Sequence, residues 1–522
     1  MPQRTAKVVF INPGLASKHP FRDLKRELAG SRPYGMRPLA AGILKSLTPK
    51  NKITYIDDNA ADTFDWNKLM NDGVNMVALT VLTHNAPRAY EIAAQARAHG
   101  MQPVLGGWHP TLMPEEAKQH GTVVRGEAYL TWKRVIRDFE AMELKGQYAA
   151  DRFASPDEIV SPDRSIYPGI NHQVIATTGC KYSCTFCCMA AFYKGRMAAK
   201  QVKQVVNEIE GIGEYLHRYS FADDNMSAFP EATMEIFSAL AASNAKRTEE
   251  SRKKLEFFAF MGVEIGDEAN RALLETAQRA GLYRAHMGIE SLNAEALRSV
   301  SKKANLNGTA PVDRYRETFR QLHKRGISSY VAAIFGFDQD TQESIYAMRD
   351  FLLNSGVSNP IFSILTPYPG TPFWRKLQKE GRIIDTDYSN YDMAHLVFEH
   401  PVFSKPQLEN MYWECWSFLY YPENTIKRLL LNSEWIKTNV PSERDLAQLV
   451  EDIEREYNDN LLDDSDLPQI AERCLAFVDT FAWLPPPLVD RETARVHLAR
   501  DVRSNIRNFK RLTRRLHPQL FY

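Results

Sequence analysis

Short apolar runs alternate with amphipathic stretches over the first 130 residues. The segment 87–99 places Tyr90, Ile92, Ala93 and Ala96 at helical spacing, whereas the apolar runs are short and rich in β-branched residues. Because strands that alternate with helices form parallel sheets, residues 1–145 are predicted to form a doubly wound, Rossmann-like domain. The expected strands are residues 8–11, 53–56, 74–81, 103–105 and 123–124, and the expected helices are 36–47 and 87–99.

Residues 146–170 interrupt this pattern with turn-forming sequences such as Ser155-Pro156-Asp157, which indicates a linker. Six strand-then-helix units follow over residues 171–400. Repeated units of this kind form a barrel or an open parallel sheet, and a partial (β/α)6 barrel is predicted here, with its active face at the carboxyl ends of the strands. The expected strands are 173–177, 219–222, 255–261, 284–289, 328–335 and 361–365, and the helices between them include 201–212 and 267–280.

The last region, residues 401–522, has a mostly helical pattern. Its aromatic stripe at 411–421 is interpreted as core, with a lid over an apolar substrate cavity as the alternative. Residues 491–516 combine an apolar helix face with many arginines. Such a helix either docks on the protein or makes peripheral contact with an anionic membrane. Cys415 and Cys474 are interpreted as packed thiols.

The charge balance is almost neutral, with 65 Lys and Arg against 64 Asp and Glu. This argues against a globally basic nucleic-acid binder, so no nucleic-acid partner is expected. The N-terminus lacks a signal-peptide core, and no apolar run approaches the ~20 residues of a membrane span. Six cysteines, half of them in one cluster, do not indicate a secreted disulfide framework, so a reducing cytoplasm is the predicted compartment.

Unusual sequences follow all six predicted strands of residues 171–400. Because the carboxyl ends of parallel strands share one face, these sequences are expected to form one site. They are the cysteine loop after the first strand, then Phe-Ala-Asp-Asp-Asn at 221–225, Met-Gly-Val-Glu at 261–264, Gly-Ile-Glu-Ser at 288–291, Gly-Phe-Asp at 336–338 and Thr-Pro-Tyr-Pro-Gly-Thr at 366–371.

The cysteine loop crowds Cys180, Cys184 and Cys187 into eight residues. Three thiols favour a soft metal or an iron–sulfur cluster, and they leave one coordination position open. The alternatives are a disulfide or a structural zinc site, but zinc needs four ligands and no second Cys-x-x-Cys or histidine pair lies nearby. Cys188 is a poor fourth ligand, because the adjacent Cys187 already directs its thiolate at the metal.

The Cys-x3-Cys-x2-Cys spacing, with Phe186 before the last cysteine, resembles the signature of the radical S-adenosylmethionine (SAM) family over about residues 1–400. The resemblance implies that the three cysteines hold a [4Fe–4S] cluster, whose fourth iron is chelated by SAM. Reductive cleavage of SAM then yields a 5′-deoxyadenosyl radical. The resemblance also assigns residues to SAM. Phe186 and Gly336 are placed along the adenine, and Glu290 and Ser291 at polar groups of the ribose or methionine. Asp223 and Asp224 are placed near the amino group or the substrate, and the alternative role of these carboxylates is helix capping.

The predicted strand ends of the first domain carry glycine pairs and polar residues. Glycine there lets a large ligand approach the backbone, although Gly-Gly also makes a tight turn. The run resembles the cobalamin-binding domain that precedes many radical SAM enzymes, in which Gly-Gly-x-His-Pro-Thr and a later Arg-Gly-Glu face the corrin. The residues implied to contact cobalamin are Thr83, Gly106, Gly107, Gly126 and Glu127, with Tyr368 lining the cobalamin or substrate cavity.

One motif of many cobalamin domains is missing. In Asp-x-His-x-x-Gly a histidine binds cobalt, but here His84 is followed by Asn-Ala-Pro and His109 by Pro-Thr-Leu. Both histidines are interpreted as polar loop residues. The chain is therefore expected to hold cobalamin without a protein histidine on cobalt. The alternative is a domain that has kept its fold but lost the cofactor.

Taken together, the resemblance implies a C-methyltransferase. The deoxyadenosyl radical would abstract hydrogen from an unactivated carbon of a small-molecule, lipid or natural-product substrate, and the carbon would take a methyl group from methylcobalamin. The implied electron donor is a flavodoxin or ferredoxin. The alternatives are a cyclase or rearrangement enzyme with the same cofactors and a non-catalytic cobalamin- or metal-binding sensor. Thiolation of tRNA ranks low, because residues 1–150 contain no cysteine.

Overall fold

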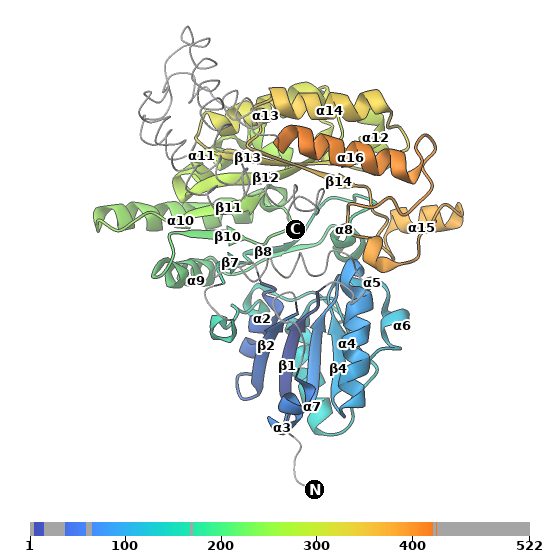
Figure 1. Cartoon of the computed structure of the whole chain (residues 1–522). Helices are drawn as coiled ribbons and strands as arrows, with labels where there is room; N and C mark the ends of the chain where they lie inside the picture. Colours follow the sequence, from blue (N-terminus) through green and yellow to red (C-terminus); the bar gives the residue numbers. More distant parts are fainter. Residues whose placement is uncertain (1–4, 15–36, 59–64, 168–170, 421–423, 425–522) are drawn as a thin grey trace, which may run out of the picture. The chain divides into compact units, whose positions relative to one another are not determined.

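The computed structural model describes residues 5–14, 37–58, 65–167, 171–420 and 424 (Figure 1). The chain divides into two compact units, Met1–Asp224 together with Thr366–Glu399, and Asn225–Leu365 together with His400–Tyr522. The first unit is therefore built from two separate stretches of sequence. Among the described helices, none combines the length and the apolar character that crossing a bilayer requires.

A six-stranded parallel sheet with the order β2-β1-β3-β4-β5-β6 forms the N-terminal part of the first unit. The order reverses at β1, which pairs with β2 on one side and β3 on the other, and ligands of doubly wound sheets bind at such a switch point. The strands are β1 Lys7–Asn12, β2 Lys52–Asp57, β3 Met76–Thr80, β4 Gln102–Gly106, β5 Thr122–Arg125 and β6 Gln147–Ala149. The first five confirm the predicted strands.

Strand β6 lies inside the segment expected to be a linker. Its three residues, Gln-Tyr-Ala, are too short to show an alternating pattern. It pairs in parallel with β5, and Tyr148 also holds it to the helix at 132–140: the ring is buried and the hydroxyl donates to Asp138 Oδ2 at 2.9 Å. The sheet therefore extends beyond residue 145.

Alternate residues of β1 enter two different cores. Val8 and Phe10 pack with helices α2 (Ala40–Leu47) and α7 (Trp132–Glu140), whereas Val9 and Ile11 pack with α4 (Ala86–Ala98). This is the two-residue period of a strand that is buried on both faces. Helices therefore cover both sides of the sheet, as the doubly wound prediction requires.

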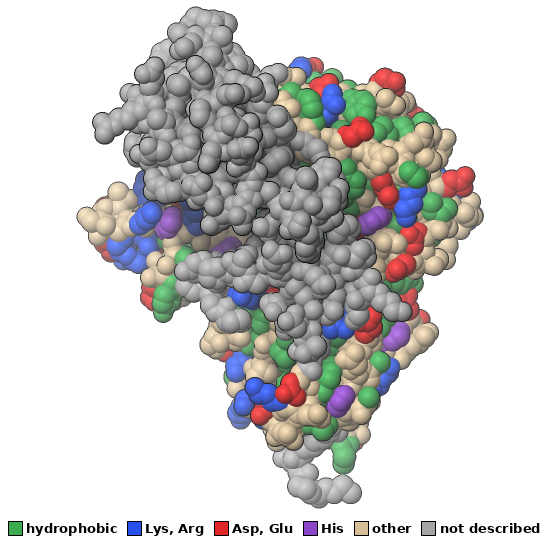
Figure 2. All heavy atoms as spheres, viewed as in Figure 1, with side chains coloured by type: hydrophobic (Ala, Val, Ile, Leu, Met, Phe, Trp, Pro, Cys, Tyr) green, Lys and Arg blue, Asp and Glu red, His purple; other side chains and the backbone are tan. Residues whose placement is uncertain are grey.

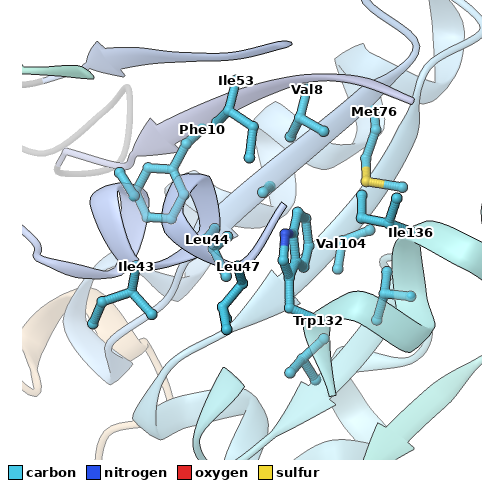
Figure 3. Packing of buried hydrophobic residues seen from close by; sticks show 14 of the residues in the cluster. Val8, Phe10, Ile43, Leu44, Leu47, Ile53, Met76, Val104, Trp132 and Ile136 are labelled. Carbon is cyan, nitrogen blue, oxygen red and sulfur yellow. The ribbon is translucent and has the colours of Figure 1, made fainter. Parts of the chain in front are cut away.

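Trp132 is central to the first of these cores. Figure 3 shows its ring among the labelled side chains of Leu47 and Val104. It is 1% exposed, and its indole N–H donates to Thr48 Oγ1 at 3.0 Å. The polar atom of a large buried ring is thus satisfied, which avoids the cost of an unpaired donor.

A strand is present at each of the six positions predicted in residues 171–400, although the first is shorter than expected. In the first unit β7 pairs in parallel with β10, and in the second unit β11 to β14 pair in parallel. The elements are β7 Gln173–Val174, α9 Val202–Gly213, β10 Arg218–Phe221, α10 Pro230–Glu249, β11 Glu256–Phe260, α11 Arg271–Ala280, β12 Leu282–Glu290, α12 Ala294–Ser299, α13 Pro311–His323, β13 Ser328–Phe335, α14 Gln342–Asn354 and β14 Asn359–Ile364. These are the repeated βα units that the pattern predicted.

The prediction of one continuous strand over 173–177 is wrong. After β7 the chain starts a second strand, β8 (Thr177–Gly179), which pairs antiparallel with β9 (Met197–Ala199). The break has a physical cause, because the buried Asp223 carboxylate accepts the backbone N–H groups of Ala176 and Thr177. Those donors are therefore withdrawn from the β7–β10 ladder.

The C-terminal region is described at residues 401–420 and 424, where helix α16 spans Lys405–Tyr420. Met411, Tyr412 and Leu419 of its aromatic and apolar stripe are buried, and the ring of Trp416 packs edge-on against Phe362 of β14 at 5.9 Å between centroids. This supports the interpretation of the stripe as core. Cys415 is also buried, and burial raises the pKa of its thiol to about 12. Residues 491–516 and Cys474 lie outside the described residues.

Candidate cofactor-binding site

The cysteine loop connects β8 to helix α8 (Cys188–Tyr193) in the first unit. Cys184 is buried, Cys180 and Cys187 are partly exposed, and the N–H of Cys187 donates to the carbonyl of Cys184 at 3.1 Å. At the start of the loop Gly179 has φ +85°, and a Cβ there would collide with the carbonyl of Arg196 on the approaching chain. The loop therefore begins at a position that only glycine fits.

The segment 366–399 also contacts the cysteine loop. The N–H of Phe373, at the start of α15 (Pro372–Lys379), donates to the carbonyl of Thr185 at 3.0 Å. Thr371 caps the same helix by accepting the N–H of Trp374 at 3.2 Å. The predicted cavity residue Tyr368 is partly buried in the turn before it, and burial raises the pKa of its hydroxyl. The Pro-Tyr-Pro-Gly-Thr sequence thus supports the cysteine loop.

Two of the predicted site carboxylates are held by backbone next to the cysteines. Asp223 also accepts the hydroxyl of Thr177 at 2.6 Å, and burial raises the pKa of its carboxyl to about 7. Asp224 accepts the N–H of Gly179 at 3.0 Å, and burial, opposed by that hydrogen bond and assisted by the charge of Glu127, raises its pKa to about 6. Both carboxylates therefore position the chain that leads into Cys180, and their contact with SAM stays a prediction.

A cavity of about 450 Å³ opens at the strand ends of the first unit. It extends between the sheet and α2, because Phe10 and Ala78 line it from strands and Ile43 and Leu44 from the helix. Four of the five predicted cobalamin contacts line it, namely Gly106, Gly107, Gly126 and Glu127. Sequence reasoning missed its aromatic residues Trp108, Tyr129, Trp132 and Tyr193, which follow no motif.

The three glycines that line this cavity differ in what a side chain at each position would meet. Gly107 has φ +105°, and a Cβ would lie 2.6 Å from the carbonyl oxygen of Val81. Gly126 has φ +75°, and a Cβ there would collide with the ring of Phe192 in α8. At Gly106 a Cβ would meet no protein atom closer than 3.9 Å. A side chain at Gly106 would therefore project into the cavity, so its absence leaves room for a ligand, which fits the predicted close approach.

The remaining predicted contact, Thr83, does not line this cavity. It is buried, and its Oγ1 lies 3.3 Å from Nδ1 of His109, whose Nε2 lies 3.2 Å from Glu116 Oε1. Burial raises the pKa of Glu116, but hydrogen bonds from His109, Tyr388 and Tyr90 outweigh it, so the pKa lies below its usual value. Both ring nitrogens of His109 have protein partners, which is not expected of a cobalt ligand, and the residue lies buried in the short helix α5 (Trp108–Leu112), not in a loop as predicted.

The cysteine loop and the cavity are joined within the first unit. Tyr193, which ends α8, lines the cavity and donates its hydroxyl to Glu127 Oε1 at 3.0 Å. Burial raises the pKa of Glu127, although this hydrogen bond acts against the rise. Phe192 of the same helix packs edge-on against Trp108 at 5.9 Å. The helix that begins at Cys188 therefore forms part of the cavity wall.

The predicted SAM residues of the second unit follow its strand ends. Glu290 ends β12 with φ +60°, a conformation that an L side chain adopts only under constraint, and its Oε1 pairs with Lys302 Nζ at 2.8 Å. Ser291 lines a smaller cavity of about 200 Å³ with Phe335 and Asp340. Asp340, which sequence reasoning missed, accepts the N–H groups of Gly336 and Phe337 at 2.8 and 3.0 Å, and burial raises its pKa to about 6.

In the described part of the chain, no three His, Cys, Asp or Glu side chains are arranged to bind a single metal ion. A [4Fe–4S] cluster does not require that arrangement, because its cysteines bind three different irons. Soft thiolates at Cys180, Cys184 and Cys187 suit such a cluster. The donor set therefore fits the predicted cofactor.

Sequence comparison gives two profile matches. The profile described as the radical SAM superfamily matches residues 174–352, and a domain of unknown function, DUF4070, matches residues 371–455. Bacteriochlorophyllide d C-12(1)-methyltransferase from Chlorobaculum tepidum is 30% identical over 360 residues, which are 66% of this chain and 74% of that protein. Anaerobic magnesium-protoporphyrin IX monomethyl ester cyclase from Cereibacter sphaeroides is 23% identical over 445 residues, 77% of this chain and 68% of that protein.

Solved structures share the fold. OxsB, a cobalamin-dependent SAM radical enzyme, superposes with a TM-score of 0.60 and 16% identity over 97% of this chain and 84% of that chain. The radical SAM methyltransferase TsrM from Kitasatospora setae gives a TM-score of 0.56 and 16% identity over 72% of this chain and 78% of that chain. The predicted fold class, a Rossmann-like domain followed by a partial barrel, is confirmed. The chain belongs to the radical SAM superfamily and is similar to methyltransferases.

Proposed function

We propose that this protein is a cobalamin-dependent radical SAM enzyme that methylates an unactivated carbon of a small-molecule or lipid substrate. One observation carries the proposal: a single compact unit contains both the cysteine loop and the strand-end cavity, and α8 joins them. A loop that binds a radical-generating cluster thus lies beside a cavity that suits a methyl carrier. The relatives named as methyltransferases support the same reaction.

The residues of the chain have separate tasks in this proposal. Cys180, Cys184 and Cys187 hold the cluster, and the apolar and aromatic walls of the larger cavity hold cobalamin and exclude water. When bound, the cluster and SAM supply the hydrogen-abstracting radical and cobalamin supplies the methyl group. Gly106 leaves space for the cofactor, and Glu127 fixes the wall through Tyr193.

Product analysis tests the proposal. The enzyme is reconstituted anaerobically with iron, sulfide, cobalamin and SAM, and it is then reduced in the presence of candidate substrates. Both 5′-deoxyadenosine and S-adenosylhomocysteine should form, because one SAM provides the radical and another restores the methyl carrier. Cys184→Ala should not form 5′-deoxyadenosine, because reductive cleavage of SAM needs the cluster, and unchanged SAM cleavage in this variant would favour a non-catalytic sensor.

A second candidate is a radical cyclase or rearrangement enzyme with the same cofactors. The similarity to the magnesium-protoporphyrin ester cyclase, over 77% of this chain, favours it. Formation of 5′-deoxyadenosine without S-adenosylhomocysteine would reject methyl transfer and support this alternative.

The other expected partners belong to the same proposal. A flavodoxin or ferredoxin would deliver the electron in a reducing cytoplasm. No nucleic acid is expected, and the described surface visible in Figure 2 mixes acidic, basic and apolar side chains. Membrane contact through residues 491–516 concerns a segment outside the described residues. A flotation assay with anionic vesicles, comparing full-length protein with a truncation at Asp490, tests that contact.

A further inference from the structure

The chain around the cluster cysteines is basic. From residue 164 to residue 207 the sequence contains no Asp or Glu, although the whole chain balances 64 acidic residues against 65 basic ones. Within this stretch, the exposed cations of the cysteine loop and of the turn after α8 are Lys181, Lys194 and Arg196. These three residues are called the basic patch.

The members of the basic patch lie close together in the first unit. Strands β8 and β9 pair antiparallel with Gly179 opposite Met197, and the patch residues belong to the chain that leaves and re-enters these two strand ends. A Cβ at Gly195 would lie 3.7 Å from the carbonyl oxygen of Lys181, and a Cβ at Gly179 would collide with the carbonyl of Arg196. The two chain segments are therefore in contact, and their three charges share one small part of the surface.

The patch is held in place by backbone conformation and by aromatic rings. Lys194 ends α8 in the left-handed conformation, with φ +51°. The guanidinium carbon of Arg196 lies 5.1 Å from the centre of the Phe153 ring. Nζ of Lys181 lies 5.5 Å from the centre of the Tyr182 ring. The rings attract these two cations without neutralising them, so the charges stay available to a partner.

No carboxylate neutralises the patch in the part of the chain that the structure describes. None of the ion pairs there includes a member of the patch, whereas the neighbouring Arg164 and Lys200 both pair with Glu208 at 2.7 Å. Like charges held close together repel each other, and an acidic surface laid over them would relieve that repulsion. The patch therefore favours a negatively charged partner.

The position of the patch indicates what kind of acidic partner it suits. Lys181 directly follows Cys180, and the thiols of Cys180 and Cys187 are partly exposed. A cluster bound by these thiols would lie close to the patch. Because the rate of electron transfer falls steeply with distance, an electron carrier gains from docking at this place.

We propose that the basic patch is the docking surface for an acidic electron-transfer protein of the flavodoxin or ferredoxin type. The inference rests on the proposed function for the cluster, and it does not depend on methyl transfer. The docked donor loses one electron and the cluster gains it, so no bond forms or breaks and no proton moves. The charges of Lys181, Lys194 and Arg196 accelerate the encounter, because opposite charges steer association.

Stopped-flow reduction of the anaerobically reconstituted enzyme tests the docking surface. The patch variant combines Lys181→Gln, Lys194→Gln and Arg196→Gln, and the donor is a reduced acidic flavodoxin. At low ionic strength the second-order rate of cluster reduction should fall about tenfold or more, since steering by opposite charges raises association rates by about 10–10³-fold. Added salt should slow the wild type towards the variant, because it screens the attraction.

The matched control removes three charges elsewhere in the same unit. Lys50, Lys52 and Lys68 are exposed, the first two at the amino end of β2 and the third on α3 (Trp66–Asn71). Their combined glutamine variant should be reduced by flavodoxin at the wild-type rate. Reduced methyl viologen, a small cation, should reduce the patch variant at least as fast as the wild type, because the charges that repel it are gone. Exchanging Lys for Arg and Arg for Lys within the patch should keep the flavodoxin rate.

A second readout does not depend on the cluster. A zero-length carbodiimide, which joins lysine amines to carboxylates, should cross-link Lys181 or Lys194 to the oxidised flavodoxin, and the patch variant should bind that flavodoxin more weakly than the control. A loss of methyl transfer alone would leave both readouts intact.

Three outcomes would overturn the proposal. An unchanged flavodoxin rate in the patch variant would make the patch a solvated face. Equal losses with flavodoxin and methyl viologen would assign the charges to the cluster itself. Loss of binding to anionic vesicles, with the flavodoxin rate unchanged, would assign the patch to a membrane surface.

Discussion

The contact between Gly126 and Phe192 gives a quantitative test of how the cavity wall is built. Gly126 has φ +75°, and a Cβ would meet the ring of Phe192, with Cε2 at 2.9 Å. In Gly126→Ala the left-handed conformation costs about 1–2 kcal/mol for a residue with a Cβ. Forcing an extra methyl into a packed wall costs about 1–3 kcal/mol more. The sum predicts a loss of about 2–5 kcal/mol of stability.

Two other glycines separate these contributions. Gly100 has φ +73° but no atom within 4 Å of its would-be Cβ, so Gly100→Ala should show the backbone cost alone. Gly146 has neither a positive φ nor a neighbour within 4 Å, so Gly146→Ala should be close to neutral. The expected order of destabilisation is therefore Gly126→Ala, then Gly100→Ala, then Gly146→Ala.

Urea unfolding followed by circular dichroism measures the order, and absorbance titration with cobalamin measures the effect on the cavity. In a Phe192→Ala background the cost of Gly126→Ala should fall to that of Gly100→Ala, because the collision is gone. The reasoning is refuted if Gly126→Ala loses no more stability than Gly100→Ala, or if Phe192→Ala leaves the difference unchanged.

Three further predictions concern single contacts. Glu290→Gln should lower stability because it removes the carboxylate that pairs with Lys302 at 2.8 Å, and adding Lys302→Met should recover most of the loss in urea unfolding. Burial raises the pKa of Asp340 to about 6 from an unfolded value of 3.8, so the folded state binds this proton more tightly. The contribution of Asp340 to stability should therefore fall as pH rises from about 4 to about 6. Asp340→Asn should flatten that part of the pH profile, as measured by unfolding. Thr48→Val leaves the buried indole N–H of Trp132 without an acceptor and should cost about 1–3 kcal/mol, and an unchanged midpoint in fluorescence-monitored unfolding would contradict that role.

The strands were predictable where apolar runs were long enough to show a period. Strand β13 occupies the predicted residues, whereas β6 has only three residues and gave no pattern. The break between β7 and β8 depends on Asp223, which is 46 residues away from Thr177 in sequence, and no local pattern contains such a contact. The predicted start of the helix at 267 was early, because residues 268–270 form a 3-10 turn before α11 begins at Arg271.

The candidate site was also only partly predictable from the sequence. The cysteine loop was predictable because its three thiols lie within eight residues. The roles of single carboxylates were not predictable. A strand-end glutamate can pair with a lysine, as Glu290 does, or have one oxygen without a hydrogen-bond partner among the described residues, as Glu264 does. Only the folded structure distinguishes these two outcomes, since Lys302 follows Glu290 by 12 residues and Ser227, which hydrogen-bonds to the other oxygen of Glu264, precedes it by 37.

The discontinuous first unit sets the timing of its assembly during synthesis. The stretch up to Asp224 is completed by Thr366–Glu399, which supplies Phe373 to the cysteine loop and Tyr388 to Glu116. At about 5–20 residues per second, the ribosome needs on the order of 10–35 s to pass from residue 224 to residue 399. For that interval the nascent chain carries the cysteine loop without its support. Stable cluster insertion is therefore expected only after residue 399 has left the ribosome.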